Sequence, residues 1–86
     1  MFGFLDFDRM KIHELKIWPI YFEAVSNGSK TFEVRKNDRN YLEGDRVILR
    51  EWNPDTEKFT MRQMSFKIGY VFPFIGGQVV FSLLKE

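Results

Sequence analysis

The fold is decided by a short helical pattern that leads directly into an alternating one: Trp18-Pro19-Ile20-Tyr21-Phe22-Glu23-Ala24-Val25-Ser26-Asn27-Gly28, then Ser29-Lys30-Thr31-Phe32-Glu33-Val34-Arg35-Lys36. Apolar side chains in the first stretch recur at i, i+3, i+4 and i+7, the spacing of one helix face: Trp18, Tyr21, Phe22 and Val25. Pro19 suits the first helical turn, and Gly28 suits the left-handed residue that ends a helix. We therefore expect a helix near residues 18–27 that packs through this stripe.

The second stretch predicts a strand, because its polar and apolar residues alternate. Thr31, Glu33 and Arg35 lie on one face, and Phe32 and Val34 on the other. Further strands are predicted at residues 11–17, 46–52, 59–70 and 78–84, separated by polar, Gly or Pro turn signals. The expected fold is mainly β (α+β): a small β-barrel of about five strands with one short helix.

Composition limits the kinds of site that this domain can build. The 86 residues carry thirteen Lys/Arg and twelve Asp/Glu, so a site for an anion must come from local clustering of basic residues. The absence of cysteine and the single histidine, His13, argue against a metal site, and no cofactor is expected. Ten Phe, three Tyr and two Trp can supply the core of so short a chain.

Residues 1–9 do not fit the pattern that begins at Met10. They could form an added edge strand, an arm that binds a partner, or an extension upstream of a true start at Met10; we expect them to be dispensable. Residues 10–86 are expected to form a single domain. The first residues lack a basic segment, and the apolar runs are too short to span a bilayer, so we expect a cytoplasmic protein without membrane association.

The densest polar cluster lies between Lys30 and Arg39. Glu33 and Arg35, two residues apart on one strand face, have Cα atoms roughly 7 Å apart. Their side chains can pair with each other or jointly bind a group that carries both donors and acceptors. The alternative is a solvated or salt-bridged strand face without a ligand.

Residues 28–35 resemble the Gly-x-Lys-x-x-Glu-x-Arg signature of ASCH domains, which belong to the PUA-like superfamily. The wider context is similar to a small bacterial and phage branch of uncharacterised function: His13-Glu14-Leu15-Lys16, Tyr21-Phe22, Arg35-Lys36-Asn37-Asp38-Arg39 and Leu42-Glu43-Gly44-Asp45. The resemblance covers about residues 11–84. It implies a PUA-like barrel in which the helix and the signature strand border a cleft for RNA or a nucleotide.

The resemblance also implies which residues bind the ligand. The signature supplies Lys30, Glu33 and Arg35, and the pattern of the branch adds His13, Lys16, Asp38 and Arg39. Lys36 is a further candidate, as a cation that can contact a phosphate. Arg35 offers a planar fork to a phosphate or a base edge, and Glu33 accepts from amines or hydroxyls or holds Arg35 in place. Single-stranded RNA is the favoured partner, with Tyr41, Trp52 and Tyr70 as candidates for base stacking. As a lone histidine on an apolar strand face, His13 more often has a structural role.

Two other functions remain open. Some ASCH proteins are amidohydrolases of acylated cytidine nucleosides that use a lysine, a threonine and a later glutamate. Lys30 matches the lysine, but Glu33 stands at the threonine position and residues 59–85 contain no Asp or Glu. A Lys30–Glu33 acid–base pair could still act on a modified nucleoside.

The remaining alternative is a protein-interaction module with an apolar patch of Phe2, Phe4, Phe7, Phe72 and Phe74. An open cleft floored by Glu33 and Arg35 would favour a binding module or a hydrolase, whereas a cleft filled by aromatic side chains would favour protein interaction.

Overall fold

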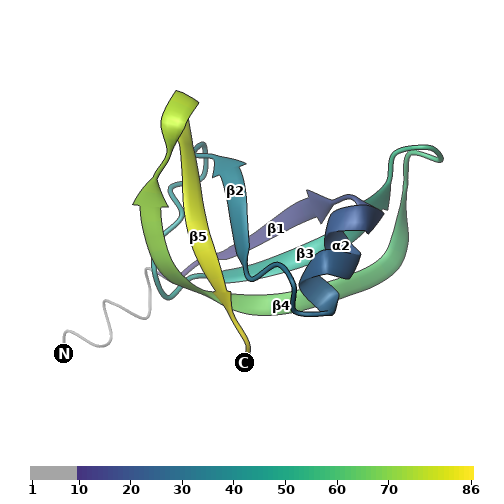
Figure 1. Cartoon of the computed structure of the whole chain (residues 1–86), viewed down its shortest axis with the longest axis horizontal. Coiled ribbons are helices and arrows are strands. Elements are labelled where there is room, and N and C mark those ends of the chain that lie inside the picture. Colours follow the sequence, from purple (N-terminus) through teal and green to yellow (C-terminus); the bar gives the residue numbers. More distant parts are fainter. Residues whose placement is uncertain (1–9) are drawn as a thin grey trace.

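The computed structural model describes residues 10–86; the segment 1–9, including the expectation that it is dispensable, lies outside the described residues. The elements are β1 (Ile12–Ile17), α2 (Pro19–Ser26), β2 (Phe32–Lys36), β3 (Arg46–Asn53), β4 (Lys58–Pro73), the 3-10 turn η1 (Ile75–Gly77) and β5 (Gln78–Leu84) (Figure 1). The prediction of a mainly β fold with five strands and one short helix is confirmed.

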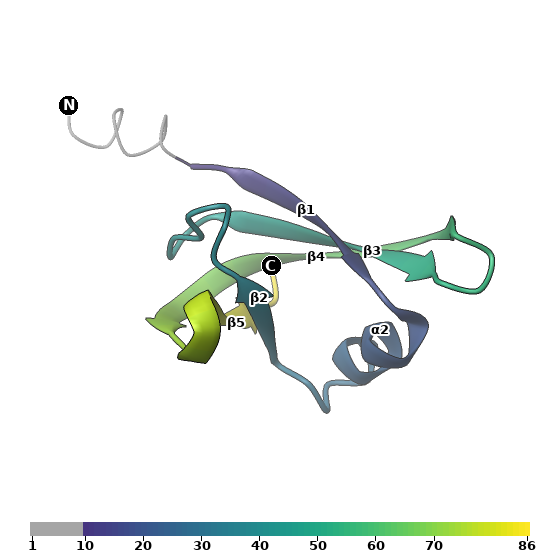
Figure 2. The same cartoon turned by 90° about the horizontal axis from the view of Figure 1, so that it is seen from above.

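All five strands form one mixed sheet in the order β1-β3-β4-β5-β2. β1 runs parallel to β3, and the other neighbouring pairs are antiparallel. The sheet curls into a half-barrel whose edge strands are β1 and β2, with α2 between them in the chain (Figure 2). The open side between these two edges is called the seam below.

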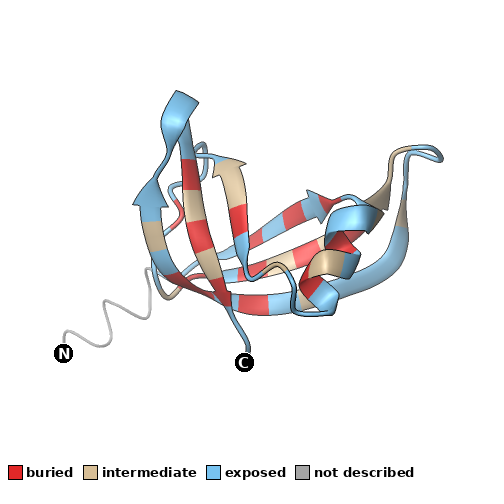
Figure 3. Cartoon of the chain, viewed as in Figure 1, coloured by how far each residue is buried: buried red, intermediate tan, exposed pale blue. Residues whose placement is uncertain are grey.

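The core lies inside the curl and follows the alternation of the strands (Figure 3). Val47, Leu49, Ile68 and Phe81 are its most deeply buried large side chains. In β1 the buried residues are His13, Leu15 and Ile17, the face that the sequence predicts. Helix α2 packs against β3. No helix in residues 10–86 has the length and apolar character required to cross a membrane.

The predicted packing face of α2 is only half correct. Phe22 and Val25 are buried, but Trp18 and Tyr21 are 53% and 51% exposed. Trp18 has extended backbone angles at the N-cap, so its side chain does not follow the helical spacing. Tyr21 lies about 100° around the axis from Phe22, and so falls at the margin of the buried face.

Candidate functional site

Glu33 is the centre of the candidate site and one of the few buried carboxylates, with 2% of its surface exposed. In the pairing of β2 with β5, Glu33 lies opposite Phe81 and Arg35 opposite Val79. Paired residues project from the same face of a sheet, so both polar side chains turn toward the inside of the half-barrel. Phe32, on the other face, is 44% exposed, which makes the polar face of this edge strand the inward one.

Two cations enclose the Glu33 carboxylate. Lys30 Nζ donates to Oε1, and Arg35 Nε donates to Oε2 at 2.8 Å. Arg35 Nη2 lies 2.7 Å from the same Oε2 and forms an ion pair with it. The side chains of Lys30 and Arg35 are 22% and 24% exposed, whereas that of Glu33 is 3% exposed. Glu33 and Arg35 therefore pair with each other, which is one of the arrangements that the sequence allows, and Lys30 is the second partner of Glu33.

The end of α2 places Lys30 beside this carboxylate. Gly28 takes the expected left-handed conformation, with φ of 84°. The chain then folds back on the helix, because Lys30 N donates to Ala24 O at 2.9 Å and Ser29 Oγ donates to the same oxygen at 3.1 Å. Both bonds use a carbonyl that the helix leaves free at its end. This turn directs the following strand along the seam.

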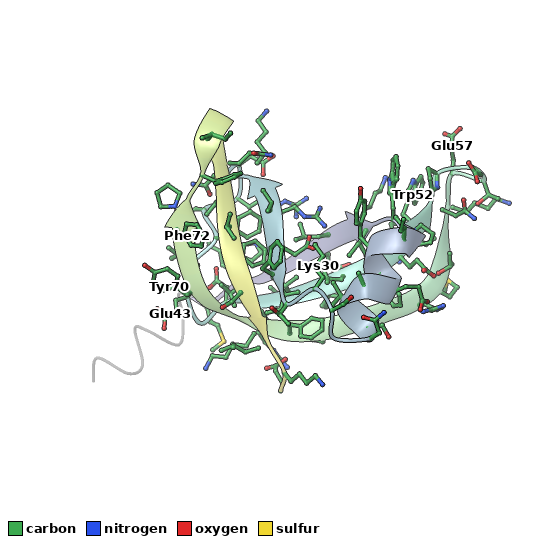
Figure 4. The ribbon with its side chains drawn as sticks, viewed as in Figure 1. Lys30, Glu43, Trp52, Glu57, Tyr70 and Phe72 are labelled. Atoms are coloured by element: carbon green, nitrogen blue, oxygen red, sulfur yellow. The ribbon has the colours of Figure 1, made fainter. Side chains whose placement is uncertain are left out.

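An open pocket of about 470 Å³ lies above the three charged residues, between α2 and β2; we call it the helix pocket. It is lined by Lys16, Ile17, Trp18 and Tyr21 on one side and by Lys30, Glu33, Val34 and Arg35 on the other. Lys30 lies between β2 and α2 in Figure 4. The exposed aromatic rings of Trp18 and Tyr21 thus form a wall opposite a mixed set of donors and acceptors.

A second pocket of about 310 Å³, the arginine pocket, adjoins the first and shares Lys16 and Arg35 with it. Its lining consists of Glu14, Leu15, Lys16, Arg35, Arg39, Arg50 and Phe59. Four of these side chains are cationic and one is acidic. Glu14 is only loosely paired, with 3.6 Å from its Oε1 to Arg50 Nη1.

Two arginine side chains bridge the seam to β1, Arg35 from β2 and Arg39 from the loop after β2. Arg35 Nη2 donates to Lys16 O at 2.9 Å, and Arg39 Nη1 donates to Glu14 O at 3.1 Å. Carbonyl groups point to opposite sides at successive residues of a strand. The carbonyl of Lys11 points toward β3, where it accepts from Arg46 N. The carbonyls of Glu14 and Lys16 therefore point the other way, to the free edge of β1. These bonds therefore satisfy acceptors that the open sheet leaves unpaired.

Two aromatic rings support cations of the arginine pocket. Lys16 Nζ lies 3.8 Å from the centre of the Trp52 ring, and Arg50 Cζ lies 3.9 Å from that of Phe59. The two rings meet edge to face at 5.0 Å. Cation–π contacts of this kind hold a charged side chain in place without neutralising it. Trp52, a candidate for base stacking, is thus covered by Lys16.

Other predicted site residues lie away from both pockets. His13 is buried and bonds through Nε2 to Asp45 Oδ2 at 2.8 Å, beneath the ring of Tyr41. Lys36 and Asp38 are exposed and line neither pocket.

The other stacking candidates also lie elsewhere. Tyr41 is 4% exposed, and this burial raises the pKa of its phenol, an effect that Arg39 and Arg35 oppose. Tyr70 packs on Phe72, away from Lys30 (Figure 4).

The structure adds residues that sequence reasoning missed: Trp18, Tyr21, Arg50, Phe59 and Glu14. A local signal existed for Tyr21, because a helix of eight residues cannot bury every apolar side chain of its sequence, and for Trp18, because it precedes Pro19 and so lies before the helix. Arg50 and Phe59 belong to the β3–β4 hairpin, and only the parallel pairing of β1 with β3 brings them to the seam. Among residues 10–86, no three His, Asp or Glu side chains converge in an arrangement that could hold a metal ion.

Residues 12–82 match the family described as Domain of unknown function (DUF3850), and the chain therefore belongs to this family. The chain is also 47% identical over 58 residues to an uncharacterised 12.9 kDa protein in the GpA 3′ region of Escherichia phage P2. That match covers 67% of this chain and 51% of the phage protein, so the chain spans about half the length of this curated relative.

Proposed function

We propose that this chain is an ASCH-type member of the PUA-like superfamily that binds single-stranded RNA or a nucleotide in the helix pocket. The observation that carries the proposal is the buried Glu33 carboxylate, held between Lys30 and Arg35 at the floor of an open pocket. A carboxylate buried among cations adds little net stability to a fold, because the cost of desolvating the charges offsets much of their attraction. A role in recognition accounts for its position better.

The chemistry of the pocket suits a nucleobase. Trp18 and Tyr21 present half-exposed rings, and stacking a base on an aromatic side chain contributes about 1–3 kcal/mol. Lys30 Nζ lies 5.9 Å from the Tyr21 ring centre, which places a cation beside the stacking surface. Lys30 and Arg35 can donate to carbonyl or ring-nitrogen acceptors, and Glu33 can accept from an exocyclic amine.

A small hydrolase acting on a modified nucleoside is the second candidate, favoured by the direct contact of Lys30 Nζ with Glu33 Oε1 beside the open pocket. Such a pair can transfer a proton during hydrolysis. Protein interaction receives less support. Phe72 and Phe74 are 41% and 48% exposed, whereas Phe2, Phe4 and Phe7 lie outside the described residues, and the cleft is open rather than filled.

Titration of short single-stranded RNA at two salt concentrations, beside a product assay on acylated nucleosides, tests the proposal. If the protein neutralises two to four phosphates, a plot of the logarithm of the binding constant against the logarithm of the salt concentration should have a slope of about −1.5 to −3. Lys30→Ala should weaken binding modestly in a binding module, whereas an enzyme would keep its ligand and lose turnover. Arg46→Gln is the matched control, since Arg46 pairs with Glu86 and lines neither pocket. Absence of binding at low salt would contradict the proposal.

A further inference from the structure

We propose that the arginine pocket is a phosphate subsite and that it fixes the direction in which a nucleotide lies along the seam. The base then lies against Trp18 and Tyr21 in the helix pocket, and the phosphate attached to its sugar lies against Arg39 and Arg50. This inference rests on the proposed function and adds to it a ligand class: a phosphorylated nucleoside rather than a free one.

The charges of the two pockets differ in a way that separates base from phosphate. The arginine pocket has Lys16, Arg35, Arg39 and Arg50 around the single carboxylate of Glu14, which is 60% exposed. In the helix pocket, Lys30 and Arg35 both bond to the buried carboxylate at its floor. A phosphate therefore meets more unpaired positive charge in the arginine pocket, and that pocket is its favoured place.

The arginines are positioned before any ligand arrives. Arg39 donates one hydrogen bond to Glu14 O, and Arg50 lies on the Phe59 ring. Arg39 bonds through Nη1, and its Nε and Nη2 make no hydrogen bond within residues 10–86. Arg35 likewise keeps Nη1 free of hydrogen bonds to the described residues. Donors that are already oriented bind an anion with less loss of side-chain entropy.

The two pockets are adjacent, because both are lined by Lys16 and Arg35, so one nucleotide can contact both. Both pockets adjoin β1: Lys16 is common to both, and Glu14 belongs to the arginine pocket alone. Two residues along a strand span about 6.6 Å, the scale of the sugar that separates a base from its phosphate. Arg35 lies where the pockets meet, so its guanidinium can contact both parts of the ligand.

Calorimetric titration of the full chain with three sets of ligands tests the subsite. The first set is the four ribonucleosides, the second their 5′-monophosphates, and the third dinucleotides with one internal phosphodiester and no terminal phosphate. At low salt we expect monophosphates or dinucleotides to bind about tenfold more tightly than nucleosides. If only the monophosphates bind more tightly than the nucleosides, the ligand is a free nucleotide. If the dinucleotides gain as much affinity as the monophosphates or more, the ligand is RNA.

Arg39→Gln and Arg50→Gln should each remove most of this gain and leave nucleoside affinity within about twofold of the parent. Arg50→Gln leaves both seam bonds intact, so it separates phosphate binding from closure of the seam. Arg46→Gln is the control, because Arg46 is an exposed arginine outside both pockets. Circular dichroism of each variant verifies that it is folded.

Equal affinity for nucleosides, monophosphates and dinucleotides would overturn the subsite and leave the proposed function standing. The subsite would also be wrong if Arg46→Gln weakened the binding of monophosphates as much as Arg39→Gln and Arg50→Gln do. The tighter binding of monophosphates would then reflect the overall charge of the protein. No binding by any ligand of the three sets would overturn the proposed function and the subsite together.

Discussion

Arg35 joins the two open edges of the sheet, because its Nη2 donates a 2.9 Å hydrogen bond from β2 to the carbonyl of Lys16 on β1. The same guanidinium bonds to the buried Glu33 and lines both pockets. This side chain thus bridges the seam of the half-barrel and lies where its two pockets meet. Ligand binding and seam closure are therefore expected to be linked through this residue.

Substitutions at two neighbouring residues of α2 separate packing from binding, because Phe22 is buried in the core and Tyr21 lines the helix pocket. Phe22 is 3% exposed, so Phe22→Ala should lower the free energy of unfolding by about 3–5 kcal/mol in a denaturant titration. Tyr21→Ala removes a half-exposed ring and should cost little stability but weaken RNA binding. A Phe22→Ala variant that melts within a degree or two of the parent would contradict the packing described for α2.

The His13–Asp45 pair is expected to be structural. Asp45 also accepts from the backbone N–H groups of Lys11 and Leu42, both at 3.2 Å, so it ties the start of β1 to the turn before β3. His13→Ala leaves this buried carboxylate without one partner and should cost about 1–3 kcal/mol of stability. Nucleotide affinity of the folded variant should be unchanged. Loss of affinity at unchanged stability would instead place His13 at the ligand.

Gly69 should not tolerate a side chain. A Cβ at this position would lie 2.5 Å from Ser82 Oγ and 3.0 Å from Leu84 Cγ, next to the irregularity in the β4–β5 pairing. Gly69→Ala should therefore destabilise the chain by about 1–3 kcal/mol, measured by thermal unfolding. The cost should fall in a Ser82→Ala background, where the closest contact is removed. An equal cost in both backgrounds would show that Ser82 is not the obstacle.

Stability should fall at alkaline pH partly through Tyr41. Burial raises the pKa of its phenol in the folded chain, so the unfolded chain releases this proton at a lower pH than the folded one. The contribution of Tyr41 to the free energy of unfolding is fully present below the pKa of the phenol in the unfolded chain, about 10, and is lost as pH rises through its pKa in the folded chain. Between pH 8 and 11, the free energy of unfolding should decline less steeply in Tyr41→Phe than in the parent. Identical declines would contradict this assignment.

The sequence predicts local features of this fold well. Alternation is a local property, and it correctly indicates the buried face of β1 and the bounds of β5. Lys30 and Arg35 lie three and two residues from Glu33, so their contacts can also be anticipated from spacing alone.

Non-local features could not be predicted in the same way. Alternation separates the two faces of β2 but does not show that the face with Glu33 turns inward, because the pairing with β5 decides this. Arg35 and Lys16 are nineteen residues apart, and they meet only because strand order leaves β1 and β2 at opposite edges of a curled sheet. The arginine pocket depends on the same non-local pairing.

Chemical-shift mapping shows whether RNA binds along the seam, in the helix pocket and the arginine pocket. Amide chemical shifts of the labelled full chain should be recorded during titration with a short single-stranded RNA of mixed sequence at low salt. We expect the largest shifts in residues 14–21 and 30–35 and at Arg39, Arg50 and Phe59, the parts of the chain that line the two pockets. Shifts confined to residues 70–75, around the exposed rings of Tyr70, Phe72 and Phe74, or no shifts at all, would show that RNA does not bind in the two pockets.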